Sequence, residues 1–325
     1  MKKVTIISPC YNEVEAIPNF FKAIDPILKT IKGFEFDFVL VNDGSKDNTL
    51  SIMNEYYLKR NDVTYVALSR NFGQNPALKA GLEEAKGDYV ITMDIDLQDD
   101  VSIIPEICKK FEEGYDVVSP HRASRKKDSF LKRFTAGAFY KFINAIEGKK
   151  FLPENVDCYR AFSRRALDVL NSMPEKDVYE VINYSYLGFK TCFIDFSRPE
   201  RSAGKSKYSP IKLIKHALNV ISSGTSMPLY WSVVIGVFSM MFFCLAFIVL
   251  LVFTILGLNN ILVVSGSFGF YQFEIWTIVS LILFFLSLVL TGVGINGVYQ
   301  HNMLINTRQR PTYIIDKVYR PEDKK

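Results

Sequence analysis

The sequence contains little cysteine, little histidine and, over residues 217–307, almost no charge. Five cysteines and three histidines occur among 325 residues, and no two cysteines have C-x-x-C spacing. This scarcity argues against a disulfide scaffold or a structural zinc site, excludes a histidine-rich metal centre and fits a reducing compartment. Contents of 49% hydrophobic and 22% charged residues exclude a disordered or collagen-like chain. A net charge of +5 is too small to indicate nucleic-acid binding by itself.

Charge is missing from two long stretches. Residues 217–273 contain no Asp, Glu, Lys or Arg, and after Glu274 the same holds for residues 275–307. The apolar runs Leu229–Leu258 and Phe273–Tyr299 each exceed the roughly 20 residues with which a helix crosses about 30 Å of hydrocarbon. We therefore predict two transmembrane helices rather than two buried helices of a soluble protein.

Lysine and arginine lie outside the two runs and not between them. The connector, residues 259–272, contains neither residue type. The basic residues that precede and follow the runs are Arg198, Arg201, Lys205, Lys207, Lys212, Lys215, Arg308, Arg310, Lys317, Arg320, Lys324 and Lys325. By the positive-inside rule, both termini are expected in the cytoplasm and the connector on the other side. The N-terminus has a strand pattern, so we expect no secretory signal and predict a multi-pass protein of the inner cell membrane.

The sequence before these runs alternates strand and helix patterns. Apolar runs rich in β-formers are Val4–Ile7, Phe36–Val41, Val63–Leu68, Tyr89–Met93 and Val117–Ser119, with helical patterns near Val14–Ile31, Asp47–Arg60, Asn75–Ala85 and Ile103–Glu113. This order predicts an α/β domain over residues 1–208, with a mostly parallel sheet covered by helices on both faces. An amphipathic interfacial helix is expected over residues 209–228, the transmembrane pair over 229–307 and a basic cytoplasmic tail over 308–325.

Polar side chains gather where four of the predicted strands end. The groups are Pro9–Glu13, Asn42–Ser45, Ser69–Asn71 and Asp94–Asp96. One Asp or Asn at a strand end commonly caps a turn or helix, whereas four such ends together indicate a binding site at the carboxyl edge of the sheet. No G-x-G-x-x-G follows the first strand, and Ala203–Ser206 lacks the context of a phosphate-binding loop, so neither nucleotide motif is present.

The acidic stretch Asp94–Asp100 is the most informative motif. Asp94 and Asp96 lie two residues apart at a strand end, so both side chains can lean toward one cation. Their carboxylates and the Gln98 amide oxygen suit Mg²⁺ or Mn²⁺, which usually keep waters and bind substrate phosphates. A calcium-binding EF-hand is excluded, because its glycine is missing and a strand precedes the acids.

Six stretches match, in chain order, the motifs of one family. They are Ser8–Glu13 (P-x-Y-N-E), Val41–Thr49 (V-D-D-G-S-x-D-x-T), Ser69–Gln74 (R-N-x-G), Met93–Asp99 (M-D-A-D-L-Q-D), Val156–Arg164 (D-F-R-L-x-x-R) and Arg201–Ser209 (R-x-x-G-x-S-K-Y). Through them the sequence resembles the family 2 glycosyltransferases, specifically the membrane-anchored polyprenyl-phosphate enzymes related to dolichol-phosphate mannose synthase and the GtrB-type glucosyltransferases. Asn42 departs from the pattern by replacing an Asp, and Cys158 with Tyr159 replaces the usual Phe.

The resemblance implies a GT-A fold and a set of site residues. The nucleotide-sugar would be bound by Pro9, Tyr11, Glu13, Asn42, Asp43, Arg70, Asp94 and Ile95. The metal would be held by Asp96 and Gln98, and the catalytic acids would be Asp157, Asp94 and Asp96. Asp157 would act as a base or orient the acceptor, the alternative being a helix cap. The acceptor phosphate would be bound by Arg122, Arg125, Arg160, Arg201, Lys205 and Lys207, although these charges also suit a surface facing anionic lipid.

The implied activity is inverting transfer of a sugar from a nucleotide-sugar to a polyprenyl phosphate such as undecaprenyl phosphate. The GtrB likeness favours UDP-glucose, with a UDP-N-acetylhexosamine or GDP-mannose as alternatives, and it makes a homo-oligomer plausible. A processive polysaccharide synthase would carry Q-x-x-R-W, but the nearest match, Gln272–Trp276, lacks the arginine. A non-enzymatic lipid-binding protein would have no use for the acidic motif.

Overall fold

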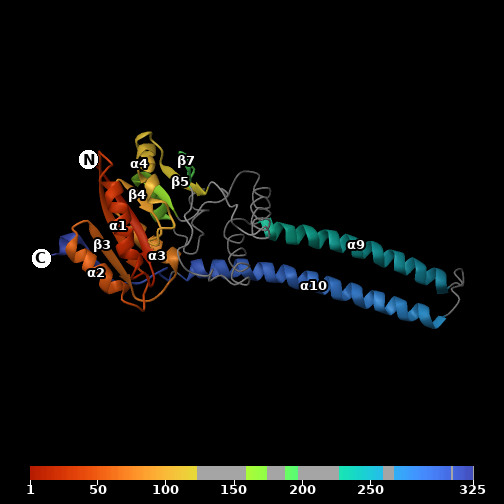
Figure 1. Ribbon diagram of the computed structural model, residues 1–325. Helices are drawn as coiled ribbons and strands as arrows, with labels where there is room; N and C mark the ends of the chain where they lie inside the picture. Colours follow the sequence, from red (N-terminus) through yellow and green to blue (C-terminus); the bar gives the residue numbers. More distant parts are fainter. Residues whose placement is uncertain (123–158, 174–186, 197–226, 259–266, 309, 325) are drawn as a thin grey trace. The chain divides into compact units, whose positions relative to one another are not determined.

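The computed structural model describes residues 1–122, 159–173, 187–196, 227–258, 267–308 and 310–324 (Figure 1). The chain forms two compact units, Met1–His216 with Gln309–Lys325 and Ala217–Arg308. The strands of the first unit are β1 (Lys2–Cys10), β2 (Phe34–Asn42), β3 (Val63–Leu68), β4 (Tyr89–Thr92), β5 (Val117–Arg122), β6 (Arg160–Ser163), β7 (Thr191–Phe196) and β8 (Ile315–Tyr319). Its described helices are α1 (Ala16–Leu28), α2 (Thr49–Lys59), α3 (Gln74–Glu84), α4 (Ile104–Glu112) and α6 (Arg164–Ser172), with the short 3₁₀ helices η1 (Val101–Ile103) and η2 (Pro321–Asp323).

All described strands of this unit belong to one sheet, in the order β7-β5-β6-β4-β1-β2-β3-β8. The central strands β4, β1, β2 and β3 are parallel to one another, which confirms the predicted parallel core. The sheet is more mixed toward its edges than the sequence indicated, because β6 runs antiparallel to β4 and β8 antiparallel to β3. The chain runs from β1 outward to β3 and then crosses to β4 on the other side of β1. The switch in strand order therefore lies between β1 and β4, where open α/β sheets bind their ligands.

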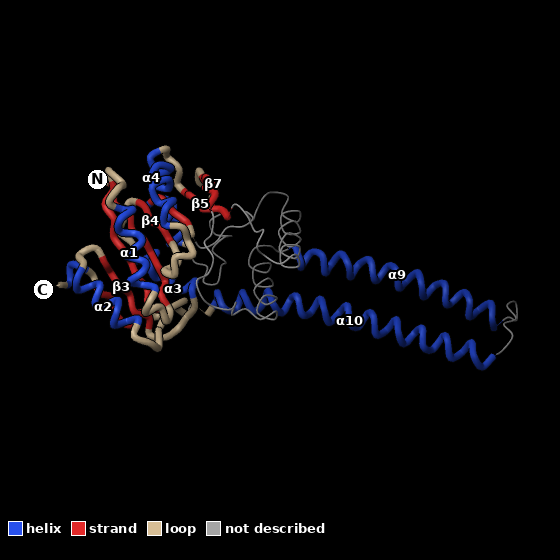
Figure 2. Tube along the Cα trace, viewed as in Figure 1, coloured by secondary structure: helices blue, strands red, loops and turns tan. Residues whose placement is uncertain are grey.

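Helices cover both faces of the sheet, as the alternating pattern predicted (Figure 2). Successive residues of a strand point to opposite faces, so Ile6 packs in the cluster that contains the buried side of α1, and Ile7 packs against α3. Phe20 and Phe21 of α1 are buried with Phe38 of β2 in edge-to-face contacts. Each such side chain contributes about 1.5–3 kcal/mol by leaving water, so this layer stabilises the packing of α1 on the sheet.

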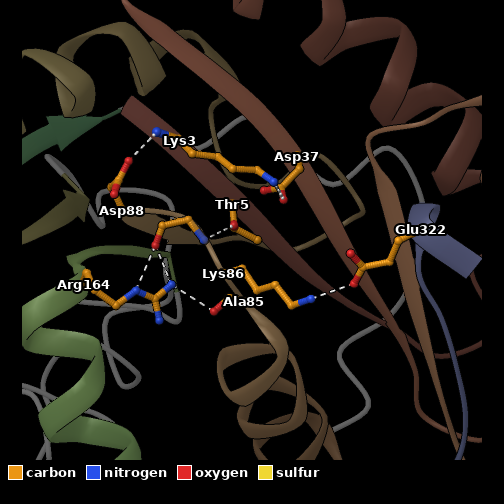
Figure 3. A network of polar contacts seen from close by, with 9 residues as sticks. Lys3, Thr5, Asp37, Ala85, Lys86, Asp88, Arg164 and Glu322 are labelled. Carbon is orange, nitrogen blue, oxygen red and sulfur yellow. Dashed lines mark hydrogen bonds and ion pairs between the residues drawn. The ribbon is translucent and has the colours of Figure 1, made fainter. Parts of the chain in front are cut away.

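Polar contacts tie several elements together near the start of β4 (Figure 3). Arg164 of α6 donates to the carbonyl oxygens of Ala85 at 2.9 Å and Gly87 at 3.0 Å, just beyond the end of α3. Lys86 pairs with Glu322 of the C-terminal segment at 2.8 Å. These contacts lie toward the amino-terminal edge of the parallel strands, opposite the edge where the polar strand ends gather.

The C-terminal segment, predicted only to be a basic tail, adds a strand to the sheet. Strand β8 pairs with β3 through Tyr65 opposite Tyr319, whose rings stack with centroids 4.4 Å apart. Beyond it, Arg320 forms a two-pronged pair with Glu84 of α3, at 2.5 and 2.9 Å. The segment that follows the second apolar run is thus built into the same unit as the N-terminal sheet.

The second unit contains two helices, α9 (Met227–Leu258) of 32 residues and α10 (Ser267–Thr307) of 41 residues, which contact each other. They contain the two predicted apolar runs, and α10 extends beyond its run at both ends. Judged on the residues that the structure describes, no helix is both long and apolar enough to cross a membrane. The transmembrane pair therefore stays a prediction, and the amphipathic helix predicted at 209–228 lies almost wholly outside the described residues.

Candidate functional site

The polar ends of β1, β2, β3 and β4 meet at the carboxyl edge of the sheet. Cys10 lies opposite Asn42 in the β1–β2 pairing, and Asn42 lies opposite Ala67 in the β2–β3 pairing, so these three strands end level with one another. The backbone N–H of Met93 donates to the carbonyl of Ile7 at 3.0 Å, which keeps the chain beyond β4 beside β1. The predicted gathering of four polar strand ends at one edge is confirmed.

The loops after β1 and β2 interlock through hydrogen bonds from backbone N–H groups to side-chain oxygens. Asn12 adopts φ of 58°, a left-handed conformation that Asn tolerates better than most residues. Its backbone N–H donates to Ser45 Oγ at 3.0 Å, while its side-chain Oδ1 accepts from the Lys46 N–H at 2.9 Å. The Glu13 N–H donates to Thr49 Oγ1 at 2.8 Å. These reciprocal contacts fix the first loop, with exposed Tyr11 on it, against the second loop.

Asn42 and Asp43 bind the protein's own backbone. Asn42 Oδ1 accepts from the Ser45 N–H at 3.1 Å. The two oxygens of Asp43, a residue only 3% exposed, accept from the N–H groups of Phe72 at 2.7 Å and Gly73 at 2.9 Å. Burial raises the pKa of Asp43, and these two donors partly offset that rise. Both side chains, which were predicted to contact the nucleotide, thus bind backbone groups of the loops after β2 and β3.

The loop after β3 packs directly on the loop after β2. Gly44 has φ of +62°, and a Cβ atom added there would lie 2.3 Å from the carbonyl carbon of Arg70 and 2.4 Å from the backbone nitrogen of Asn71. Only glycine fits such an approach. The Asn71 side chain donates to the Asp43 carbonyl at 3.2 Å, and the exposed Arg70 guanidinium lies 4.4 Å from the ring centroid of Phe72.

Asp94 lies where the first and fourth strand ends approach each other. Its Oδ1 accepts from the side-chain amide of Gln74, the first residue of α3, at 2.8 Å. Its backbone N–H donates to Asp99 Oδ2 at 2.8 Å, which closes the acidic loop on itself. The pKa of the Cys10 thiol is raised first by burial and then by the nearby carboxylates of Glu13 and Asp94.

Asp96 and Gln98 face each other within the acidic loop. Leu97 between them has φ of 58°, and this turn lets the Gln98 N–H donate to Asp96 Oδ1 at 3.1 Å. The Gln98 side-chain amide contacts the other oxygen of Asp96. The Gln98 amide nitrogen, not its oxygen, faces Asp96, so rotation of the amide would bring its oxygen beside the Asp96 carboxylate, and such a pair of hard oxygen donors suits Mg²⁺ or Mn²⁺. Among the described residues no three His, Cys, Asp or Glu side chains form a metal-binding group.

The other predicted site residues differ in their burial and in their position on the sheet, and some lie outside the described part of the chain. The side chain of Ile95 is buried in the hydrophobic core, and the residue is only 2% exposed. Any contact of Ile95 with the nucleotide-sugar would therefore be made by its backbone. Pro9 is half-buried in β1, and Arg160 is buried at the start of β6, opposite Thr92. Arg122 is the last residue of β5. The predicted residues outside the described part of the chain are Arg125, Asp157, Arg201, Lys205 and Lys207.

Sequence reasoning overlooked three residues of this edge. Gln74 and Asp99 lie inside stretches quoted as family motifs, but neither received a role, because the contacts with Asp94 depend on the folded loops. Tyr159 was noted only as a departure from the family pattern, yet it is fully buried and its hydroxyl donates to the Asp100 carbonyl at 3.1 Å.

Comparison with known proteins identifies the family to which this edge belongs. Residues 5–170, which include all four strand ends, match the family model described as glycosyl transferase family 2. The chain belongs to glycosyl transferase family 2. The predicted family is thereby confirmed, and the protein is a glycosyltransferase.

Relatives of this glycosyltransferase match it over nearly its whole length. It is 36% identical over 318 residues to the prophage bactoprenol glucosyl transferase homolog of Escherichia coli K12, covering 97% of this chain and 99% of the relative. It is also 36% identical over 320 residues to the bactoprenol glucosyl transferase of Shigella phage SfII, covering 98% and 99%. Among solved structures, the mannosyltransferase PcManGT from Pyrobaculum calidifontis, in complex with GDP-Man and Mn²⁺, matches with 20% identity and a TM-score of 0.43 over 68% of this chain and 70% of that one.

Proposed function

We propose that this glycosyltransferase transfers glucose from UDP-glucose to a polyprenyl phosphate, with inversion at the anomeric carbon, on the cytoplasmic face of the cell membrane. The observation that carries the proposal is the acidic loop at the β1–β4 switch point, in a chain whose full-length relatives are named bactoprenol glucosyl transferases. The loops after β1, β2 and β3 border the same edge and would enclose the nucleotide.

The site's oxygen donors fit a divalent cation. Asp96 and Gln98 would hold Mg²⁺ or Mn²⁺ together with the donor's diphosphate, since these ions commonly use one or two protein ligands plus substrate phosphates. When bound, the ion would neutralise the negative charge that grows on the departing nucleoside diphosphate. Asp94, held by Gln74 and by its own backbone contact with Asp99, would orient the sugar.

The acceptor needs little activation. A phosphate monoester loses its second proton near pH 6, so its oxygen is already a nucleophile at pH 7. This oxygen would attack the anomeric carbon opposite the leaving diphosphate, giving a β-linked product from an α-linked donor. Asp157 would serve as a base or hold the acceptor.

The chain's path supports a membrane-anchored enzyme with both ends on one side. The first unit includes the segments before and after Ala217–Arg308, and β8 pairs with β3 of the N-terminal part. If α9 and α10 cross the membrane, they must do so an even number of times for β8 to reach its partner. An acceptor with a long lipid chain would explain such an anchor, with Arg122, Arg125, Arg201, Lys205 and Lys207 near its phosphate.

Transfer to lipid tests the proposal directly. The full-length protein in detergent micelles is given radiolabelled UDP-glucose, undecaprenyl phosphate and Mg²⁺ or Mn²⁺, and label is counted in the organic phase. We expect glucose transfer with wild type and almost none with Asp96→Asn. Asp100→Asn is the matched control, because Asp100 caps η1 and Asn is an equally good cap.

Three results would count against parts of the proposal. Activity of Asp96→Asn within a few-fold of wild type would remove Asp96 from the metal site. Faster transfer from a UDP-N-acetylhexosamine or from GDP-mannose would replace the proposed donor. Growth of a polymer, or no transfer from any nucleotide-sugar, would overturn the reaction itself.

A further inference from the structure

A buried tyrosine lies behind the acidic loop. Tyr159 is fully buried, immediately before β6, and its ring meets Phe196 of β7 edge-to-face with centroids 5.9 Å apart. Its hydroxyl donates to the backbone carbonyl of Asp100 at 3.1 Å. A phenylalanine, the residue that the family pattern places before the arginine, would fill the same space without making this hydrogen bond.

The acidic loop is held at both of its ends by buried or capped groups. At the start, the Asp94 N–H donates to the carboxylate of Asp99, a residue only 2% exposed. At the end, Asp100 is held on both sides: its side chain accepts from the Ser102 N–H at 2.9 Å, and its carbonyl accepts from Tyr159. Asp96, between these anchors, is exposed at the rim.

The tyrosine is itself fixed to the strand that carries the loop. The next residue, Arg160, pairs with Thr92 at the end of β4, and Thr92 Oγ1 donates to the Arg160 carbonyl at 3.3 Å. The pKa of Tyr159 is raised well above its ordinary value by burial and by the carboxylates of Asp99 and Asp100, so the hydroxyl remains a donor at neutral pH. One side of the loop thus continues β4, and the other is tied to the neighbouring strand.

We propose that Tyr159 is a positioning residue for the metal-binding loop. Its hydroxyl holds the Asp100 carbonyl and thereby fixes the loop on which Asp96 and Gln98 lie side by side, from which both would bind a divalent cation with the donor diphosphate once the Gln98 amide turns its oxygen toward the ion. The inference rests on the proposed function, because it assigns the loop that role. It goes further by giving this chain a loop contact that its family's phenylalanine would not provide.

Tyr159→Phe tests the contact by removing one oxygen atom and keeping the ring. Tyr65→Phe is the matched control, since Tyr65 is also buried and its hydroxyl donates to Asn54 Oδ1 at the same distance of 3.1 Å, on β3. Because one hydrogen bond has a modest net worth, we expect Tyr159→Phe to weaken Mn²⁺ binding about three- to tenfold in the presence of UDP, measured by paramagnetic resonance on the full chain. Tyr65→Phe should bind Mn²⁺ like wild type.

Hydrogen exchange without metal separates this inference from the proposed function. Amides of residues 94–102 should exchange faster in Tyr159→Phe than in wild type, whereas Tyr65→Phe should leave them unchanged. Unchanged exchange in Tyr159→Phe, or equal Mn²⁺ affinity in both variants, would overturn the positioning role. If wild type bound no Mn²⁺ with UDP, the proposed metal site would fail, while faster exchange would still support the hydroxyl's hold on the loop.

Discussion

Gly44→Ala tests whether the site depends on the close approach of the loops after β2 and β3. The added Cβ would lie 2.3 and 2.4 Å from backbone atoms of Arg70 and Asn71. Carbon atoms normally approach no closer than about 3.5 Å, so the backbone of the loop after β3 would have to move away by about 1 Å. A shift of that size would break the hydrogen bonds from Phe72 and Gly73 to Asp43, now 2.7 and 2.9 Å long.

The magnitude follows from two separate costs. A left-handed alanine costs roughly 1–2 kcal/mol, and forcing atoms into a packed region costs about 1–3 kcal/mol more. Gly33→Ala is the matched control, because Gly33 has φ of +90° with nothing within 4 Å of an added Cβ. It incurs the first cost alone, so Gly44→Ala should be less stable than Gly33→Ala by about 1–3 kcal/mol.

Two measurements on the full-length protein check this reasoning. Urea unfolding followed by circular dichroism gives the stability difference, and calorimetric titration with UDP-glucose and Mn²⁺ gives donor affinity. We expect Gly44→Ala to bind the donor at least about tenfold more weakly, the equivalent of 1.4 kcal/mol, and Gly33→Ala to bind it normally. Equal stability of the two variants, together with wild-type donor affinity in Gly44→Ala, would refute the idea that the site needs this contact.

Two further outcomes are expected. Arg320→Ala should destabilise the first unit by about 1 kcal/mol in urea unfolding, because its two-pronged pair with Glu84 is partly buried. Lys86→Ala removes the exposed pair with Glu322 and should leave the urea midpoint unchanged. Equal effects of the two substitutions would contradict this ranking. Replacing Leu213 and Leu218 by Asp should impair transfer to undecaprenyl phosphate more than to a short, soluble prenyl phosphate, if residues 210–218 form an interfacial helix. An equal loss with both acceptors would argue against that helix.

Most of the central sheet could be predicted, because its signals are local. Apolar runs bounded by turn residues marked β1 to β4. Strand β3 ends at the predicted residue, β2 and β4 end within one residue of the prediction, and β1 runs three residues further, to Cys10. The edge strand β8 was missed. Its five residues, Ile315–Tyr319, run apolar, charged, charged, apolar, apolar, which is neither a continuous apolar run nor an alternation. The segment forms a strand by pairing with the edge of β3.

The site was predicted in its composition but not in its internal contacts. The acids of the D-x-D motif, the Gln98 amide and the polar strand ends were all found from spacing and residue chemistry. The roles of Asp43 and Asp99 as acceptors for backbone N–H groups were not foreseen, since an acid beside a motif looks the same in sequence whether it faces a ligand or the chain.

The sequence by itself determined the order of strands and helices, the acidic motif, the two apolar runs and the family, because each depends on residues that lie close together along the chain or on motifs in a set order. Only the tertiary structure decided which distant groups meet. Asp43 and Phe72 are 29 residues apart, and Tyr159 and Asp100 are 59 apart. Such pairs meet because the packed sheet brings strand ends together, and burial then favours hydrogen bonds that would be lost to water in an unfolded chain.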